Sequence, residues 1–372
     1  MSKRLTGPDL ARPAINALPA VSHANAKDPT ILMKELGLDE LVPMNNNENP
    51  LGSSPKAIQA IRDAAVHVNR YPDSSNTEIR AKLAAKYQLT PDNIICANGS
   101  DNLITSFMKA FVNEGEKVII GDPMFPIYEQ QAHSMGAEVV KVPLNADYAF
   151  DLPAMLAAID ERTKIVVVIS PHNPTGAACK KADMFAFLDK LPDHVLLVLD
   201  EAYIDFTDPQ TFPDVLPYVR EGRNILILRT FSKFMGLAGL RIGFGIAPDH
   251  IIGVLHKVIE TFSVNMLTQA ACLAALDDEE FAAASRAAAN EAKAYIGGEL
   301  KKLGCTFPES QANFLFVDMG VDAARLADQL LHRGFLVCPC GSWGYPHHLR
   351  ISFGLPEQNR RFIAAVKELL GK

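Results

Sequence analysis

The sequence predicts an α/β fold, with a large, mainly parallel sheet domain flanked by helices and a smaller α+β domain. Short β-branched runs alternate with amphipathic helical stretches from about residue 48 onward, which is typical of a parallel sheet covered by helices. The chain has 372 residues, more than one simple core usually holds. After about residue 304 a shorter mixture of strands and helices follows, which indicates the second domain.

We expect three segments along the chain. Residues 1–47 are punctuated by Pro and Asn and only weakly periodic, so they should form an arm that packs on the small domain or on a partner subunit. Residues 48–265 are expected to form the large domain, and residues 266–372 the small C-terminal domain.

The expected elements follow from runs of apolar and β-branched residues for strands and from amphipathic periodicity for helices. In the large domain, strands are expected at 93–97, 117–121, 137–142, 164–170, 195–200, 224–230 and 241–247. Helices are expected at 77–88, 101–113, 153–159, 181–191 and the Ala-rich 267–303. The last section should have strands at 313–317, 335–337 and 348–353, with helices at 323–333 and 356–370.

Composition narrows the classes of function. The formal charge is −7 and no basic stripe is present, so nucleic acid is not an expected partner. No run approaches the roughly 20 apolar residues that cross a bilayer, and the first residues lack the apolar stretch of a signal peptide. We therefore expect a cytoplasmic protein with no membrane contact. The six cysteines are expected to be reduced, and Cys338-Pro-Cys340 has no second Cys/His pair that would complete a metal site.

Polar residues follow three consecutive apolar strands of the expected large sheet. Asn173 follows the first of these strands, Asp200 and Tyr203 follow the second, and Lys233 follows the third. Taken singly, each has an ordinary structural explanation: a turn, a helix cap or a solvated surface charge. Because ligands bind beyond the carboxyl ends of parallel strands, the four side chains should share one cleft.

Together these groups have the chemistry that pyridoxal phosphate requires. A lysine amine forms a Schiff base with an aldehyde, a carboxylate keeps a pyridinium nitrogen protonated, and an amide and a phenol bind a ring oxygen. The phosphate needs a helix N-terminus and a cation. Gly99, Ser100 and Asp101 open an expected helix, and Arg241 lies eight residues beyond Lys233. Glycines from Gly236 to Gly245 do not have the spacing of a dinucleotide fingerprint, so a nicotinamide dehydrogenase is a poor alternative.

Six motifs, in this order, closely resemble the histidinol-phosphate aminotransferase family, which has the fold called PLP fold type I. The motifs are Asn47-Glu-Asn-Pro-Leu-Gly52, Arg70-Tyr-Pro-Asp73, Asn173-Pro-Thr-Gly176, Asp200-Glu-Ala-Tyr203, Arg229-Thr-Phe-Ser-Lys233 and Gly236-Leu-Ala-Gly-Leu-Arg241. The resemblance runs from about residue 12 to the C-terminus. It implies an aminotransferase that exchanges an amino group between L-histidinol phosphate, or a related amino acid, and 2-oxoglutarate or glutamate.

The resemblance also implies roles for individual residues. Lys233 would bind the cofactor covalently and move the proton, with Asp200 at the ring nitrogen and Asn173 and Tyr203 at the ring oxygen. Ser232, Arg241 and the amides of Gly99, Ser100 and Asp101 would hold the phosphate, and Phe125 would stack on the ring. Tyr71 would reach into the site of a neighbouring subunit, which implies a homodimer, while Arg350 and Asn49 would bind substrate.

Two stretches depart from the family pattern and leave alternatives open. Residues 18–22 lack the tyrosine that is common in the family, and Val337-Cys338-Pro339 has cysteine where arginine is common. An aminotransferase for aromatic or other amino acids is therefore one alternative. A decarboxylase similar to threonine-phosphate decarboxylase is another. A catalytically idle binding module is disfavoured, because every chemical group for the reaction is present.

Overall fold

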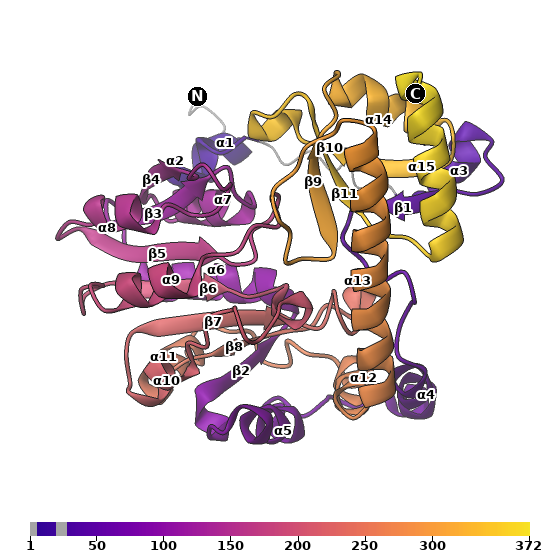
Figure 1. Ribbon diagram of the computed structural model, residues 1–372. Coiled ribbons are helices and arrows are strands. Elements are labelled where there is room, and N and C mark those ends of the chain that lie inside the picture. Colours follow the sequence, from indigo (N-terminus) through magenta and orange to yellow (C-terminus); the bar gives the residue numbers. More distant parts are fainter. Residues whose placement is uncertain (1–5, 20–27) are drawn as a thin grey trace, which may run out of the picture.

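The computed structural model describes residues 6–19 and 28–372, and the fold is given for these residues. Two sheets form its framework, one of seven strands and one of four (Figure 1). The large sheet has the strand order β2-β8-β7-β6-β5-β3-β4. Its strands are β2 (Ile94–Ala97), β3 (Lys117–Asp122), β4 (Glu138–Pro143), β5 (Thr163–Ile169), β6 (Leu196–Asp200), β7 (Ile225–Thr230) and β8 (Gly243–Ile246).

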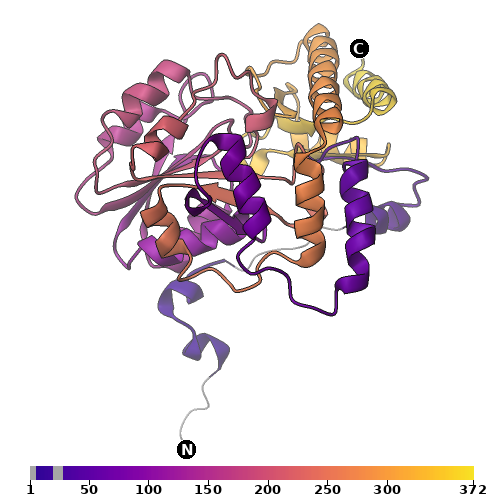
Figure 2. The ribbon, with the colours of Figure 1, turned by 90° about the horizontal axis from the view of Figure 1, so that it is seen from below.

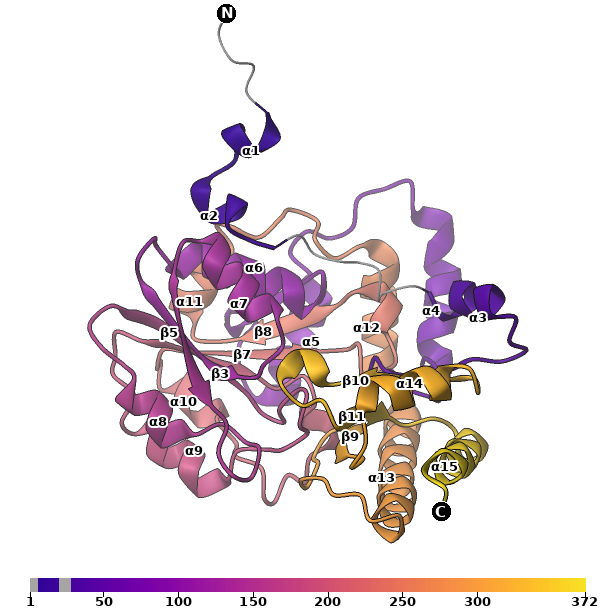
Figure 3. The ribbon, with the colours of Figure 1, turned by 90° about the horizontal axis from the view of Figure 1, so that it is seen from above.

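The large sheet is mainly parallel, as predicted. Strands β4, β3, β5, β6 and β7 pair in parallel, whereas β8 runs antiparallel to both β7 and β2. The central strands have long apolar runs, with polar residues only at their ends, because both faces of the sheet are covered. Figure 3 shows α6 and α7 on one face and α8 and α9 on the other. All seven strands lie within two residues of their predicted limits.

The small sheet has the order β1-β10-β11-β9, and it packs against α13, α14 and α15 around a second apolar core. Its strands are β1 (Val42–Met44), β9 (Phe314–Asp318), β10 (Phe335–Pro339) and β11 (His348–Ser352). The pairing of β1 with β10 is parallel, and the other two pairings are antiparallel. The predicted smaller α+β unit is therefore present, with an edge strand contributed by residues that the sequence assigns to the arm.

Each stretch in which the periodicity predicts a helix contains at least one, but the helices before residue 65 and those at 127–134, 216–220 and 249–255 were not predicted. The helices up to residue 157 are α1 (Gly7–Leu10), α2 (Pro13–Asn16), α3 (Pro29–Leu36), α4 (Pro55–Ala64), α5 (Thr77–Tyr87), α6 (Gly99–Phe111), α7 (Ile127–Ser134) and α8 (Leu152–Ala157). The later ones are α9 (Lys181–Leu188), α10 (Leu216–Arg220), α11 (Asp249–Leu255), α12 (Met266–Leu276), α13 (Glu279–Lys302), α14 (Ala323–Leu331) and α15 (Pro356–Leu370). Figure 2 shows α4 and α12 side by side.

Two helix predictions need correction. The Ala-rich stretch 267–303 is two helices, α12 and α13, and not one. Asp278 is the N-cap of α13, where its side chain accepts a hydrogen bond from the amide of Phe281. Helix α6 begins at Gly99, two residues earlier than predicted, so Gly99, Ser100 and Asp101 form its first turn. The sequence analysis also missed α4, although Ser54 followed by Pro55 is an ordinary helix-start signal.

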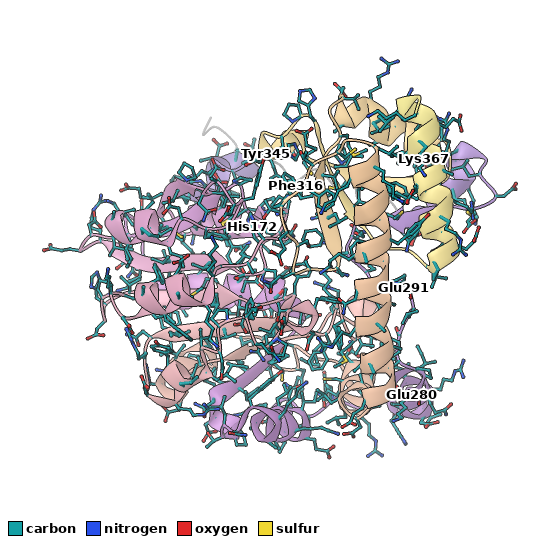
Figure 4. All side chains as sticks on the ribbon, viewed as in Figure 1. His172, Glu280, Glu291, Phe316, Tyr345 and Lys367 are labelled. Atoms are coloured by element: carbon teal, nitrogen blue, oxygen red, sulfur yellow. The ribbon has the colours of Figure 1, made fainter. Side chains whose placement is uncertain are left out.

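The two sheets meet through aromatic side chains as well as through the site described below. Tyr148, between β4 and α8, has its ring centroid 5.9 Å from that of Phe316 on β9. Phe316 and Tyr345, both labelled in Figure 4, lie edge to face with centroids 5.1 Å apart. Among the described residues no helix combines the length and apolar character needed to cross a membrane.

Candidate active site

A cavity of about 420 Å³ opens where the carboxyl ends of β5, β6 and β7 face the small sheet. This is the end of a parallel sheet at which ligands usually bind. The structure brings ten of the predicted site residues to its wall: Ser100, Asp101, Phe125, Asn173, Asp200, Tyr203, Ser232, Lys233, Arg241 and Arg350. The groups after three consecutive strands therefore do share one cleft, and Arg350 on β11 adds the small sheet to it.

Lys233 lies just after β7 and its amine is held inside the cavity. Its Nζ donates a 2.8 Å hydrogen bond to the carbonyl oxygen of Asn46. Burial, together with the nearby positive charge of Arg350, lowers the pKa of Lys233 to about 8. At pH 7 about a tenth of this amine is thus uncharged, far more than in an ordinary lysine, and the uncharged form is the one that acts as nucleophile or general base.

Asp200 is the last residue of β6 and is buried against Tyr128 of α7. The hydroxyl of Tyr128 donates a 2.6 Å hydrogen bond to Oδ2 of Asp200, and the amide of Ala202 donates to Oδ1 over 3.0 Å. Burial raises the pKa of Asp200 to about 6, while these two hydrogen bonds act in the opposite direction. A protonated ring nitrogen placed in the cavity would favour the ionised carboxylate.

Arg350 connects the small sheet to the large one. Its Nη1 donates a 2.6 Å hydrogen bond to Oδ1 of Asn173, and its Nη2 donates to the carbonyl oxygen of Asn45. The guanidinium carbon lies 5.7 Å from the ring centroid of Phe314 and 5.5 Å from that of Trp343. Nε is buried and has no hydrogen-bond partner among the described residues. A planar cation held in this way suits a carboxylate ligand.

Tyr203 brings a buried phenol to the cavity. Its hydroxyl oxygen accepts a 2.9 Å hydrogen bond from Nδ2 of Asn47, and its ring packs edge to face on Phe314 with centroids 5.2 Å apart. Burial raises the pKa of Tyr203, so the phenol keeps its proton. The hydroxyl hydrogen remains available for an acceptor in the cavity.

The first turn of α6 forms the anion-binding end of the cavity. The side chain of Asn98, at the N-cap, gives no capping hydrogen bond, which leaves the first amides open to a ligand. Nη2 of Arg241 lies 3.2 Å from Oδ2 of Asp101, and the hydroxyl of Ser232 accepts a 3.0 Å hydrogen bond from Thr230. Gly99 has φ +79°, and a Cβ there would lie 2.7 Å from Nη2 of Arg241. The positive φ favours glycine here, and a side chain would also displace the guanidinium of Arg241.

The groups on this wall match the functional groups of pyridoxal phosphate one by one. An uncharged amine faces the space that an aldehyde would occupy, a buried carboxylate can pair with a ring nitrogen, and a phenol and an amide can bind a ring oxygen. The open helix start with Arg241 can bind a phosphate. The residues present therefore fit this cofactor.

Gly99 lies beneath Arg241 and does not itself line the cavity, and two further predicted residues lie elsewhere. Asn49 does not line the cavity, because its Nδ2 donates to the carbonyl oxygen of Phe234 and to the hydroxyl of Ser285, each over 2.9 Å. Tyr71 is 81 % exposed and stacks on Phe262 with ring centroids 4.7 Å apart. The placement of Asn49 does not support substrate binding, and that of Tyr71 leaves its role in a partner's site a prediction.

The sequence analysis missed several residues of the cavity, chiefly Asn46, Asn47 and Thr230. Three consecutive asparagines, Asn45 to Asn47, directly follow the short apolar run Val42–Met44, which forms β1. This is the same pattern of polar residues after a strand that identified the other groups. It was missed because three residues are a weak strand signal.

The position of Cys338 bears on the substrate. Cys338 of β10 is the direct antiparallel neighbour of Arg350 on β11, and it is partly exposed. Directly opposed residues project to the same face of a sheet, so the thiol lies beside the guanidinium. Of the stretch 18–22, residues 20–22 lie outside the described part of the chain. Among the described residues there is no group of three or more His, Cys, Asp or Glu that could hold a metal ion.

Comparison with known proteins relates the fold and the site to one family. The family model "Aminotransferase class I and II" matches residues 39–366. The chain is 43 % identical to histidinol-phosphate aminotransferase of Symbiobacterium thermophilum over 92 % of this chain and 94 % of the relative. It is 41 % identical to the enzyme of the same name from Moorella thermoacetica, over 91 % and 88 %. The crystal structure of histidinol-phosphate aminotransferase from Sinorhizobium meliloti in complex with pyridoxal-5'-phosphate has a TM-score of 0.89 and 28 % identity, and covers 97 % of this chain and 98 % of that one.

Proposed function

The chain belongs to the class I and II aminotransferase family, and we propose that it transfers the amino group of L-histidinol phosphate to 2-oxoglutarate. It is a pyridoxal-phosphate-dependent aminotransferase with PLP fold type I. The names of its relatives support this amino donor. The observation that carries the proposal is the single cavity in which Lys233, Asp200, Tyr203 and the start of α6 converge.

Each group of the cavity has a proposed task in binding the cofactor. Lys233 attaches it, Asp200 pairs with the ring nitrogen, and Asn173 and Tyr203 bind the ring oxygen. Phosphate is bound by Ser232, Arg241 and the amides of Gly99, Ser100 and Asp101, while Phe125 stacks on the ring. The contacts of these side chains support the tasks, because each leaves a polar group or a ring face toward the cavity.

The reaction needs an electron sink and a proton carrier. When bound, the cofactor supplies the sink for the bond broken at the α-carbon of the donor. The Lys233 amine would take the proton from the α-carbon of the donor and deliver it to the cofactor carbon that receives the amino group. Its lowered pKa supports this task, because an uncharged amine accepts a proton near neutral pH. Arg350 holds the carboxylate of glutamate or 2-oxoglutarate, so that the reacting carbon faces Lys233.

One observation favours a second donor class. Cys338 lies beside Arg350 and offers no charge for a phosphate, where an arginine would supply a charge-assisted hydrogen bond worth roughly 1.5–3 kcal/mol. An aminotransferase for aromatic amino acids is therefore the alternative proposal.

We also propose a homodimer in which Tyr71 completes the phosphate site of the partner. Val66, Val68 and Tyr71 are 76 %, 61 % and 81 % exposed within one short stretch, which supports a covering surface there. Mixing Lys233→Ala and Tyr71→Ala chains tests this, because only exchange across the interface gives a hybrid with one intact site and restored turnover. The cytoplasmic location remains a prediction.

A half-reaction tests the proposed activity. Cofactor-loaded protein is mixed separately with histidinol phosphate, glutamate, phenylalanine, tyrosine and aspartate, and the visible absorbance of the cofactor is followed. Rapid conversion by histidinol phosphate is the expected result. Conversion by phenylalanine or tyrosine without histidinol phosphate would favour the alternative, and release of CO₂ would indicate a decarboxylase.

A further inference from the structure

Asn47 is a buried junction between the two sheets. It lies three residues beyond β1 and is 1 % exposed. Its Nδ2 donates to Oη of Tyr203 over 2.9 Å, and its backbone amide donates to Oγ of Ser352 over 2.9 Å. Oγ of Ser352 donates back to its Oδ1 over 2.8 Å, and Nδ2 of Asn313 donates to its carbonyl oxygen over 3.0 Å. Every polar atom of Asn47 is therefore paired.

The side-chain amide of Asn47 lies between the hydroxyls of Ser352 and Tyr203. Ser352 donates to its Oδ1, and its Nδ2 group faces Tyr203. In the bond from Asn47 the phenol oxygen of Tyr203 is the acceptor, so its hydroxyl hydrogen is free to point into the cavity. The amide thus makes the phenol a donor toward the site.

The backbone of Asn47 indicates that this arrangement has a conformational cost. Asn47 has φ +55°, in the left-handed region that side chains other than glycine adopt with some strain. Asparagine tolerates the region better than most residues. Glycine would relieve the strain but would lose both side-chain hydrogen bonds, so the contacts of the amide to Tyr203 and Ser352 explain an asparagine here.

We propose that Asn47 is a positioning residue, which holds Tyr203 as a hydrogen-bond donor to the ring oxygen of the bound cofactor. Asn47 is itself held by hydrogen bonds to Ser352 and Asn313 of the small-sheet side. This inference rests on the proposed cofactor site. Arg350 lies two residues before Ser352 on β11. The strand that would bind a carboxylate ligand through Arg350 therefore also holds the phenol of Tyr203, through Ser352 and Asn47. Arg350 and Asp200 are the charged groups whose fields reach Tyr203.

The test is a pH titration of the visible spectrum of the cofactor-loaded protein, together with the dissociation constant of the cofactor. A donor to the ring oxygen favours its anionic form, so weakening that donor should move the spectral midpoint to higher pH. Asn47→Gly keeps the backbone conformation and should raise the midpoint by about 0.4 to 1 pH unit, about 2.5- to 10-fold in the ionisation constant. Asn47→Asp should shift it further, because a carboxylate facing Tyr203 would take the phenol hydrogen for itself.

Two controls separate this role from a merely structural one. Gln88→Gly replaces another residue with positive φ, +54°, at the end of α5, and should leave the midpoint unchanged. Ser352→Ala should shift it in the same direction as Asn47→Gly but less, because the amide is then no longer fixed. It also keeps the test informative if an Asn47 variant folds poorly.

The outcomes distinguish this inference from the proposed function. A Tyr203→Phe variant with a raised midpoint, beside Asn47→Gly and Asn47→Asp variants that titrate like the unaltered protein, would overturn the role of Asn47 alone. An unchanged midpoint in Tyr203→Phe would overturn both the role of Tyr203 and that of Asn47. Failure of the protein to develop a visible band with pyridoxal phosphate would overturn the proposed function itself.

Discussion

Tyr128 and Asp200 form a buried pair in which the phenol donates a 2.6 Å hydrogen bond to the carboxylate that lies at the end of β6. This bond lowers the pKa of Asp200, whereas burial raises it. Tyr128 thereby helps to keep the carboxylate of Asp200 ionised at a buried position, where solvent water does not stabilise the charge. None of the recognised motifs contains Tyr128.

Tyr128→Phe should weaken cofactor binding about tenfold, because Asp200 loses a hydrogen bond to its charged form and pairs less well with a ring nitrogen. The dissociation constant of pyridoxal phosphate, measured by absorbance with cofactor-free protein, checks this. Tyr295→Phe, on the partly exposed face of α13, is the matched control. Equal affinities for the two variants would show that the bond to Asp200 does not matter for binding.

Asp200 should also affect the stability of the cofactor-free protein. Burial raises its pKa from 3.8 to about 6, so between these values the folded chain keeps a proton that the unfolded chain has lost. The contribution of Asp200 to the free energy of unfolding therefore falls as the pH rises from about 4 to about 6, by roughly 3 kcal/mol. Urea unfolding across this pH range should show the fall in the unaltered protein and in the exposed control Asp193→Asn, and a smaller fall in Asp200→Asn.

The amine of Lys233 should gain reactivity as the pH approaches about 8. Burial lowers its pKa to about 8, and the positive charge of Arg350 contributes. The rate at which cofactor-free protein forms the visible band with pyridoxal phosphate should rise up to this pH and then level off. Arg350→Gln should move the midpoint of this rise in rate to higher pH, because a nearby positive charge is removed. Replacing the exposed Arg360 in Arg360→Gln should leave the midpoint unchanged. An equal shift in both variants would contradict the effect of Arg350 on the pKa of Lys233.

Trp343 should report on ligands at Arg350. It is the single tryptophan of the chain, and its ring centroid lies 5.5 Å from the guanidinium carbon. Glutarate, a dicarboxylate that cannot react, should change the tryptophan fluorescence of the loaded protein. Trp343→Leu should weaken glutarate binding about 3- to 30-fold by loss of the cation–π contact, and Trp343→Phe should weaken it less, as followed for these variants by the visible absorbance of the cofactor. Unchanged fluorescence at saturating glutarate would place the carboxylate elsewhere.

Gly236 should not tolerate a side chain. It has φ +67°, and a Cβ there would lie 2.0 Å from the carbonyl oxygen of Gly52. Gly236→Ala should lower the free energy of unfolding by more than about 3 kcal/mol, because backbone atoms must move apart. In Gly253→Ala, on helix α11, the new methyl group meets nothing within 4 Å, and a gain of about 0.5–1 kcal/mol is expected. Thermal and urea unfolding of both variants check the contrast.

Much of the large sheet could be predicted from the sequence, because strands that are buried on both faces have long apolar runs such as 164–170. Lys233, Asp200 and Asn173 could be placed at one cleft because parallel strands end at the same edge. Arg350 was identified only by family resemblance, since nothing in its local pattern predicts that β11 faces the cavity.

The residues that could not be predicted depend on long-range packing. Asn47 meets Tyr203 across 156 positions, and Tyr128 meets Asp200 across 72. No periodicity reveals such contacts, because they depend on how elements that are distant along the chain pack together. Asn49, predicted from its motif, instead ties the loop after β1 to Phe234 and Ser285.

The contact of Lys233 with the carbonyl of Asn46 has a consequence for assembly of the protein. The lysine and this carbonyl are 187 positions apart, and Arg350 reaches back 305 positions to Asn45. Closing loops of this length is slow compared with forming helices, so we expect the cavity to form late in folding. Appearance of the visible cofactor band during refolding should therefore follow the recovery of helical circular dichroism, and the colour of the protein would serve as a signal that the whole chain has folded.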